Sequence, residues 1–321
     1  MSSAPRPVLV WSKTDPSQSG PRGVKRPTLF SDYAILLKVR VTSLVVLTAW
    51  TGFYLACTKT GVSSLSWKLL CTLMGIGLVA GGAAALNQVI EREIDGLMLR
   101  TKERPLPAQR MQVSHALAVG LAAILGGAAY LAWTTNPLTG FLSVLTAASY
   151  VGLYTPLKKY SPMATFVGAF PGAMPPLLGW TALRGRIEWE ALVLFAILFL
   201  WQFPHFHAIG WLYREDYKRA GIRMLPAVER HGRATVREVL AYTMLLVPVS
   251  LFPGYLNMVK RGYIPAALIL GLFFLGFAVQ FAKLLSEPAA PESRKYARQM
   301  LRASIIYLPV LFGMMMIFSR Y

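Results

Sequence analysis

Charged residues are scarce in this 321-residue sequence, at 15% of the chain, against about 25% in a soluble globular domain. Acidic residues are the rarest, with 14 Asp and Glu against 33 Lys and Arg, which gives a net charge of +19. The charges are also uneven, because they gather in short clusters between long uncharged segments. Together with a hydrophobic content of 55% and a mean hydropathy of +0.47, this excludes an ordinary soluble domain and predicts a chain that spans a membrane.

Cysteine is almost absent, which argues against a redox or metal centre built from thiolates. The two cysteines, Cys57 and Cys71, lie in apolar segments without a CxxC pair or nearby histidines, so we interpret them as buried core residues. The basic excess would indicate nucleic acid in a soluble protein. In a membrane protein it is better explained by basic loops kept on the inner side, so we expect the lipid bilayer and no nucleic acid as a partner.

The uncharged windows predict nine transmembrane helices, each near the roughly 20 residues that a bilayer requires. One window, 111–157, is long enough for two helices and is broken at the turn signal Thr134-Thr135-Asn136-Pro137. Because lipid offers no hydrogen bonds to an open sheet, the expected fold is an all-α integral membrane bundle over residues 35–321. The other windows are 41–58, 69–90, 160–183, 191–213, 239–259, 262–282 and 303–319.

The distribution of basic residues predicts the orientation of these spans. On the N-terminal side of nine spans lie 26 of the 33 Lys and Arg, so we expect the N-terminus on the inner side. That side is the cytoplasm if the chain lies in a cell inner membrane, or the matrix if it lies in a mitochondrial inner membrane. Residues 1–34, rich in Pro, Ser and Gly near their start, are expected to be a disordered inner-side tail.

The most informative polar residues are Asn87, Glu91 and Asp95, which follow an apolar span at intervals of four. On a helix this spacing drifts only about 40° per step, so the three side chains form one polar row about 12 Å long. Stacked carboxylates repel each other unless a cation lies among them. Hard oxygen ligands suit Mg²⁺, which commonly shares its coordination shell with phosphate oxygens.

Basic residues follow the polar row directly, in the segment Arg100-Thr-Lys-Glu-Arg104-Pro-Leu-Pro. Arginine is suited to bidentate phosphate recognition, so carboxylates beside arginines predict a metal-diphosphate site on the inner face. The alternative is a solvated helix end with ordinary inner-side arginines. The alignment of three oxygen-bearing side chains at the end of an apolar span favours the functional interpretation.

A second polar cluster lies near the end of the predicted span 191–213. His205 and His207 are two residues apart, so on a helix they point about 200° apart and cannot both face one ligand. The segment continues through Tyr213 to Glu215 and Asp216.

From about Lys38 to the last helix, the chain resembles the UbiA superfamily of intramembrane prenyltransferases, and within it the haem O synthases. The resemblance rests on motifs in the expected order on the expected spans: Asn87-x3-Glu91-x3-Asp95, Met98-x-Arg100-Thr101-x2-Arg104-Pro105-Leu106-Pro107, Tyr154-Thr155 with Lys158, the glycine- and proline-rich stretch from Gly168 to Gly179, and His205-Phe206 leading to Asp216-Tyr217-x2-Ala220-Gly221. It implies nine helices around a central cavity. It also implies transfer of a farnesyl group from farnesyl diphosphate to a vinyl group of haem B, with addition of water, to form haem O.

The resemblance assigns roles to individual residues. Mg²⁺ and catalysis are expected at Asn87, Glu91, Asp95 and Asp216. Substrate contacts are expected at Lys38, Arg40, Arg100, Arg104, Lys158, His205, Tyr213 and Lys218, with His205 toward haem. Many superfamily members have a second Asp-rich motif, and here Tyr213 stands where its leading Asp would align. A haem A synthase or a terminal oxidase is the protein partner that the resemblance implies.

Two other functions are compatible with parts of the pattern. A UbiA-type prenyltransferase acting on a quinone precursor or another aromatic or tetrapyrrole acceptor is the nearer alternative, although His205-Phe206 and the missing Asp-rich motif argue against it. A transporter with the polar row as an ion site is more distant, because transporter sites usually lie near the membrane midplane in broken helices.

Overall fold

The computed structural model describes residues 28–286 and 291–320, which form helices and no β-strand apart from an isolated bridge between Val259 and Ser319. Eight helices in this part of the chain are long and apolar enough to cross a membrane. Some continue through a short adjoining helix. Their bounds are α2 Val39–Cys57, α3 Trp67–Leu97, α4 Val113–Thr134, α5 Pro137–Ala148 with η1 Ser149–Tyr154 and α6 Thr155–Leu157, α8 Trp189–Leu212, α11 Arg233–Val249 with α12 Phe252–Tyr255, α13 Tyr263–Phe281 with η2 Ala282–Leu285, and α14 Pro291–Ile317.

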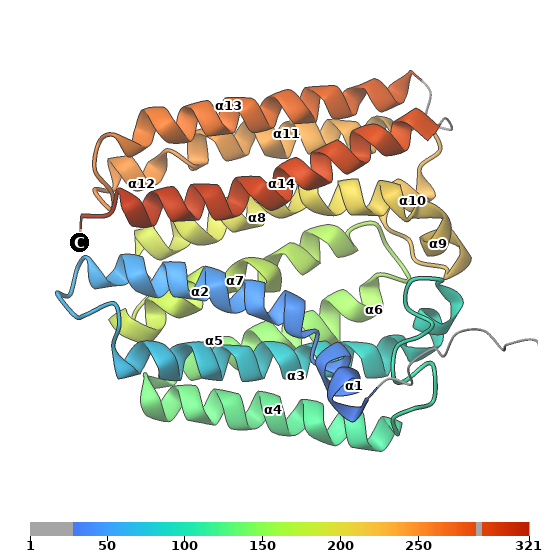
Figure 1. Ribbon diagram of the computed structural model, residues 1–321, viewed down its shortest axis with the longest axis horizontal. Helices are drawn as coiled ribbons and strands as arrows, with labels where there is room; N and C mark the ends of the chain where they lie inside the picture. Colours follow the sequence, from blue (N-terminus) through green and yellow to red (C-terminus); the bar gives the residue numbers. More distant parts are fainter. Residues whose placement is uncertain (1–27, 287–290, 321) are drawn as a thin grey trace, which may run out of the picture.

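The predicted span at 160–183 is α7, Ala164–Arg184, which lies in the bundle beside the other helices (Figure 1) but is not among the eight. It is long enough to cross, but it is less apolar because three prolines and three glycines interrupt its sequence. Most of its residues are buried, so α7 faces protein more than lipid. The nine predicted spans therefore correspond to eight strongly apolar helices and one interior helix.

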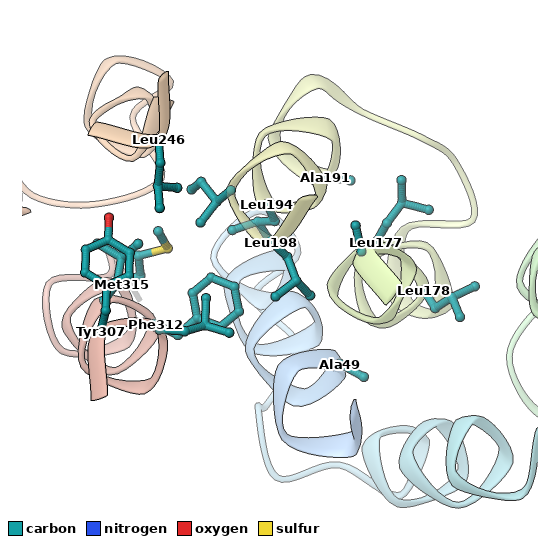
Figure 2. Packing of buried hydrophobic residues seen from close by; sticks show 14 of the residues in the cluster. Ala49, Leu177, Leu178, Ala191, Leu194, Leu198, Leu246, Tyr307, Phe312 and Met315 are labelled. Carbon is teal, nitrogen blue, oxygen red and sulfur yellow. The ribbon is translucent and has the colours of Figure 1, made fainter. Parts of the chain in front are cut away.

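Close backbone contact explains the small residues of α7. A Cβ atom on Gly52 of α2 would lie 1.9 Å from the carbonyl oxygen of Pro176, and one on Gly179 would lie 1.9 Å from that of Ala49. No side chain fits at either position, so glycine lets α2 and α7 pack backbone to backbone. Figure 2 shows the neighbouring core, where side chains of α2, α7, α8, α11 and α14 converge.

The spans are arranged as two adjoining groups (Figure 1). One contains α2, α3, α4, α5 and α7, and the other contains α8, α11, α13 and α14. Contacts between α7 and α8 and between α2 and α14 join them. The short helices α1 (Leu29–Leu36), α6, α9 (Arg214–Arg219) and α10 (Leu225–Val228) gather at the end of the bundle where α3 terminates, whereas α12 and the C-terminus lie at the opposite end.

Two boundaries test the sequence interpretation directly. The break in window 111–157 is confirmed, because α4 ends at Thr134 and α5 begins at Pro137, with the Asn136 side chain accepting a hydrogen bond from the Thr139 amide. The predicted tail is wrong at its end, since residues 29–34 belong to α1. The Thr28 hydroxyl caps this helix and the buried Asp32 pairs with Arg110, so the segment is ordered by contacts distant in sequence. The remainder of the predicted tail, up to residue 27, lies outside the described residues.

Candidate active site

The polar row lies in the last third of α3, which has 31 residues and is therefore about 46 Å long, against a hydrocarbon core of about 30 Å. The extra length lets one end of α3 extend beyond the hydrocarbon core. Asn87 is fully buried, Asp95 is 1% exposed and Glu91 is 7% exposed. Buried carboxylates of this kind must be paired, because isolated charges are strongly disfavoured away from water.

Each member of the polar row is paired with a cation from a different segment. The Lys38 ammonium donates to Asn87 Oδ1 at 2.6 Å, and the Lys158 ammonium donates to Glu91 Oε1 at 2.8 Å. Asp95 Oδ2 accepts from the Arg104 guanidinium at 2.7 Å. The structure thus brings together six of the predicted site residues, and each of the two carboxylates is neutralised by its own cation.

Lys38 reaches the row from a sharp turn between α1 and α2. Its backbone is left-handed, with φ 46° and ψ 49°, a conformation that is uncommon for residues other than glycine and costs on the order of 1 kcal/mol. Burial, together with the neighbouring charges of Lys158 and Arg104, lowers the pKa of Lys38 to about 7. An ammonium at this position is therefore poised to gain a stronger anionic partner.

The segment that carries Lys158 also supplies partners that the sequence interpretation did not assign. The Asn87 amide nitrogen donates to Thr155 Oγ1 at 3.1 Å, and that hydroxyl donates to the Tyr150 carbonyl at 2.9 Å. The Lys158 ammonium lies 4.4 Å from the centre of the Tyr154 ring. The Tyr154-Thr155 pair in the motif was the available signal, but its contacts depend on the π-helical segment η1, which the sequence pattern did not predict.

Arg104 is delivered by the turns that follow α3. The Thr101 hydroxyl donates to the Asp95 backbone carbonyl at 2.9 Å, which folds this segment back onto the helix end. The second carboxylate oxygen of Asp95, Oδ1, is buried and has no hydrogen-bond partner. A buried carboxylate oxygen without a donor is costly unless a cation completes its environment.

These groups fit Mg²⁺ when it is shared with a phosphate ligand. The row offers two carboxylates and one amide oxygen, and the unpartnered Asp95 Oδ1 is an available ligand atom. Within the described residues, no group of three or more His, Cys, Asp and Glu side chains could hold a metal ion. The row alone is therefore an incomplete cage, which is the usual situation for Mg²⁺, since it keeps waters and substrate phosphates in its shell.

The side chains of the other predicted residues have partners outside the polar row. Arg100 stacks over the Tyr213 ring, with 5.3 Å between its Cζ atom and the ring centre. Asp216 accepts a hydrogen bond from Arg219 at 3.0 Å, and the exposed Lys218 pairs with Glu215. The side chain of Arg40, in the first turn of α2, is exposed. The structure therefore shows no contact of these residues with the row, and a role in substrate binding for any of them stays a prediction.

The two histidines point to different helices, as their spacing predicted. His205 Nδ1 lies 2.8 Å from Ser304 Oγ of α14, and its ring stacks on Trp201. His207 Nε2 lies 2.8 Å from Glu238 Oε2 of α11. Neither contact involves the polar row, so any role of His205 concerns another part of the bundle.

The segment around α9 and α10 packs against the end of α3. Ile94 and Met98 form an apolar cluster with Tyr217 and Met224, and the Arg223 amide donates to the Lys158 carbonyl at 2.8 Å. The second predicted motif is therefore adjacent to the first through packing, and it covers one side of the site.

A second ionic cluster, partly buried, occupies the opposite end of the bundle, between α7 and α8. Glu188 accepts hydrogen bonds from Trp180 and Arg184, both at 2.8 Å, and from Arg186 at 3.1 Å. We call these four residues the far-end cluster. A surface cavity of about 580 Å³ lies beside it, lined by residues that include Lys59 and Glu190, which form an ion pair. The hydrogen bonds from Arg184, and from Trp180, lower the pKa of Glu188 to about 2.

Comparison with known sequences identifies the family. The UbiA prenyltransferase family matches residues 45–305. The protoheme IX farnesyltransferase of Koribacter versatilis (strain Ellin345) is 52% identical over 304 residues, which cover 94% of this chain and 98% of the relative. The protoheme IX farnesyltransferase of Solibacter usitatus (strain Ellin6076) is 43% identical over 292 residues, which cover 89% of this chain and 98% of the relative.

Solved structures agree on the fold. A digeranylgeranylglyceryl phosphate synthase gives a TM-score of 0.73 at 18% identity, covering 90% of this chain and 98% of that one. A UbiA homolog from Archaeoglobus fulgidus bound to DMAPP and Mg²⁺ gives a TM-score of 0.59 at 14% identity, covering 89% of this chain and 99% of the homolog. The match extends over most of the chain and includes the helix that carries the polar row, so this protein belongs to the UbiA prenyltransferase family.

Proposed function

We propose that this chain transfers a farnesyl group from farnesyl diphosphate to a vinyl group of haem B and, with addition of water, forms haem O. The observation that carries the proposal is the polar row, because three ligating oxygens lie beside three cations at the end of a membrane helix. The relatives that are 52% and 43% identical are both protoheme IX farnesyltransferases, which supports this donor and acceptor over other prenyl transfers.

The residues of the row exchange partners when the donor binds. Asn87, Glu91 and Asp95 would hold Mg²⁺, with Asp216 as a further ligand from the segment around α9 and α10. Bound there, Mg²⁺ would withdraw charge from the diphosphate and make it a better leaving group. Lys38, Arg104 and Lys158, released from the row, bind the diphosphate oxygens, since charge-assisted hydrogen bonds of this kind are the strongest available. The DMAPP and Mg²⁺ in the Archaeoglobus fulgidus homolog support this role for the family.

The reaction is an ionisation followed by capture of the cation. The allylic C–O bond breaks and its electron pair leaves with the diphosphate, where the three cations stabilise the new charge. The vinyl π electrons of haem attack the farnesyl cation and form the new C–C bond. Water adds to the positive centre left beside the porphyrin and loses a proton. The bundle must keep water away from the farnesyl cation until the vinyl group has reacted.

The acceptor side is assigned to the other group of helices. His205 lies between α8 and α14, with Nδ1 at 2.8 Å from Ser304 Oγ, and we infer that its other ring nitrogen contacts haem through iron or a propionate. Arg100 and Tyr213, which stack on each other, together with Lys218 and Arg40, remain further proposed substrate contacts.

The membrane setting follows from the same features. The relatives are bacterial, which favours the cell inner membrane over the mitochondrial one. The excess of Lys and Arg on the N-terminal side supports the proposal that the N-terminus and the polar row face the cytoplasm. Haem A synthase or a terminal oxidase would take up the product, and we propose one of them as a partner.

The decisive experiment compares acceptors in membranes that contain this chain. Farnesyl diphosphate is supplied with either haem B or 4-hydroxybenzoate, and pigments are identified by mass spectrometry. We expect haem O with haem B and no prenylated benzoate. Formation of the benzoate product alone would assign the chain to quinone-precursor prenylation, and absence of both products together with absence of diphosphate release would favour a transporter.

A further inference from the structure

Gln88, the residue after Asn87, is buried and lies outside the polar row. Its amide nitrogen donates two hydrogen bonds, to the Ile35 carbonyl at 2.9 Å and to the Leu36 carbonyl at 2.7 Å. Both carbonyls belong to the last turn of α1, where carbonyls lack partners within the helix. Gln88 therefore connects the helix of the polar row to the end of α1.

The chemistry of the amide fixes its orientation. With the nitrogen toward the two carbonyls, the amide oxygen Oε1 is buried and has no hydrogen-bond partner. Rotation of the amide by 180° would place that oxygen against two carbonyl oxygens, which cannot donate. A fully buried glutamine with one unpartnered atom is disfavoured relative to an apolar residue, so double donation to α1 is its distinctive contribution.

The carbonyls held by Gln88 control the turn that presents Lys38. The Ile35 carbonyl also accepts the Lys38 amide at 3.1 Å, and the Lys38 carbonyl accepts the amides of Val41 and Thr42 at 2.8 and 2.9 Å. The left-handed Lys38 is thus held between the end of α1 and the start of α2. Movement of the Ile35 carbonyl would move the Lys38 backbone, and with it the ammonium that reaches Asn87.

We propose that Gln88 is a positioning residue that aims Lys38 at the diphosphate, and that it acts only through the α1–α2 turn. This inference rests on the proposed function, in which Lys38 binds a diphosphate oxygen. Other contacts hold α1 in place, including Asp32 with Arg110 and Tyr33 with His115. Those contacts involve Asp32 and Tyr33, which come earlier in α1 than the two carbonyls, so they provide a comparison in which α1 is loosened without removal of the hydrogen bonds from Gln88.

The test uses the full chain in lipid nanodiscs with four variants: Gln88→Met, which keeps the length of the side chain but cannot donate, Lys38→Met, the double variant, and Tyr33→Phe. Binding of farnesyl diphosphate with Mg²⁺ is measured without haem, and KM is measured for both substrates. We expect Gln88→Met to weaken farnesyl diphosphate binding about tenfold, as for loss of a charge-assisted hydrogen bond, and to leave KM for haem and the thermal midpoint unchanged. In the Lys38→Met background, the Gln88→Met substitution should weaken farnesyl diphosphate binding by less than about twofold further, because Gln88 acts only through Lys38.

A purely structural role of Gln88 gives different results. The inference would be overturned if Gln88→Met weakened farnesyl diphosphate binding equally with and without Lys38, or if Tyr33→Phe weakened it as much. It would also be overturned if Gln88→Met lowered the thermal midpoint and raised KM for both substrates. Acylation of Lys38, followed by mass spectrometry, provides a readout that does not depend on the reaction. The acylation rate of Lys38 should change several-fold in Gln88→Met, because Lys38 then leaves its contact with Asn87, and it should stay unchanged in Tyr33→Phe. Equal rates in all three proteins would overturn the positioning role. If the unaltered chain does not bind farnesyl diphosphate, the proposed function fails, while the labelling result still decides the role of Gln88.

Discussion

Both ends of the bundle carry ionic clusters, but the polar row is buried, whereas the far-end cluster is only partly buried, and the two are built differently. At one end, the polar row of α3 is paired with cations from three segments that lie far apart in sequence from one another. At the other end, Glu188 of the far-end cluster is bonded to residues within eight positions of itself. Local pairing closes a loop between two helices, whereas pairing between distant segments creates a place where partners can be exchanged.

The two clusters also differ in how many of their carboxylate oxygens accept hydrogen bonds. In the far-end cluster both oxygens of Glu188 accept hydrogen bonds, while Asp95 in the polar row has one buried oxygen without a partner. A saturated carboxylate stabilises the fold and has little capacity for a ligand. A carboxylate at a membrane helix end with one oxygen free of hydrogen bonds can still bind a ligand. Four substitutions probe this distinction, starting with the largest expected effect.

Asp95→Asn removes the charge and keeps the size of the side chain. We expect haem O formation to fall by about 1000-fold or more, as when a group that stabilises the leaving charge is lost, with no defect in membrane insertion. The measurement is turnover of farnesyl diphosphate with haem B. Glu93→Gln is the matched control, because its side chain is 79% exposed on the same helix, and it should retain normal turnover.

Lys158→Met leaves Glu91 buried without its cation. Breaking a buried pair in this way costs about 3–5 kcal/mol, so the thermal midpoint should fall clearly in metal-free buffer and turnover should fall about 100-fold. Mg²⁺ should restore more stability to this variant than it adds to the unaltered chain, because a cation then returns to the row. The exposed neighbour Lys159, changed to Met, is the control. An equal response to Mg²⁺ in all three proteins would contradict a metal site at the row.

The lowered pKa of Lys38 predicts how the binding of farnesyl diphosphate depends on pH. Its pKa is lowered to about 7, so the ammonium is charged below pH 7 and loses its proton as pH rises. Affinity for farnesyl diphosphate should therefore weaken above pH 7, by up to about tenfold per pH unit. Lys38→Arg should remove this dependence, because a guanidinium stays protonated. The same slope in both proteins would show that another group titrates.

Glu188→Gln tests the far-end cluster and should affect stability alone. The pKa of Glu188 is about 2, below its ordinary value, so the stabilisation is present above about pH 4.5 and is lost as pH falls toward 2. At neutral pH we expect a loss of about 1–2 kcal/mol and turnover within about twofold of normal. A marked loss of turnover at an unchanged thermal midpoint would give both ends a functional role.

The sequence predicted the parts of the fold that depend on local composition. Apolar windows and the Asn136-Pro137 turn located the spans, because lipid requires long apolar helices. The span at 160–183 was predicted, but the interior position of α7 depends on backbone contact at Gly52 and Gly179, which a hydropathy pattern does not contain. The helix α1 was not predicted, because it depends on the Asp32–Arg110 pair.

The same limit applies to the site. The four-residue spacing was sufficient to predict the polar row and to place Arg104 near it. The pairing of Lys38 with Asn87 was not predictable, because it requires a left-handed turn and a buried glutamine behind it. Asp216, Tyr213 and Lys218 were grouped with the site by motif order, and their side chains have other partners here.

Among residues 28–286 and 291–320, the side chains that pair with the polar row, and the row itself, lie between residues 38 and 158. The groups proposed to activate the prenyl donor are thus encoded mainly in the first half of the chain, with Asp216 as a proposed metal ligand from the second half. Substitutions elsewhere in the second half can change the shape presented to an acceptor without touching the groups proposed to ionise the donor. Such a division makes the scaffold evolvable, because the residues that break the allylic bond can be kept while the residues that select the acceptor change.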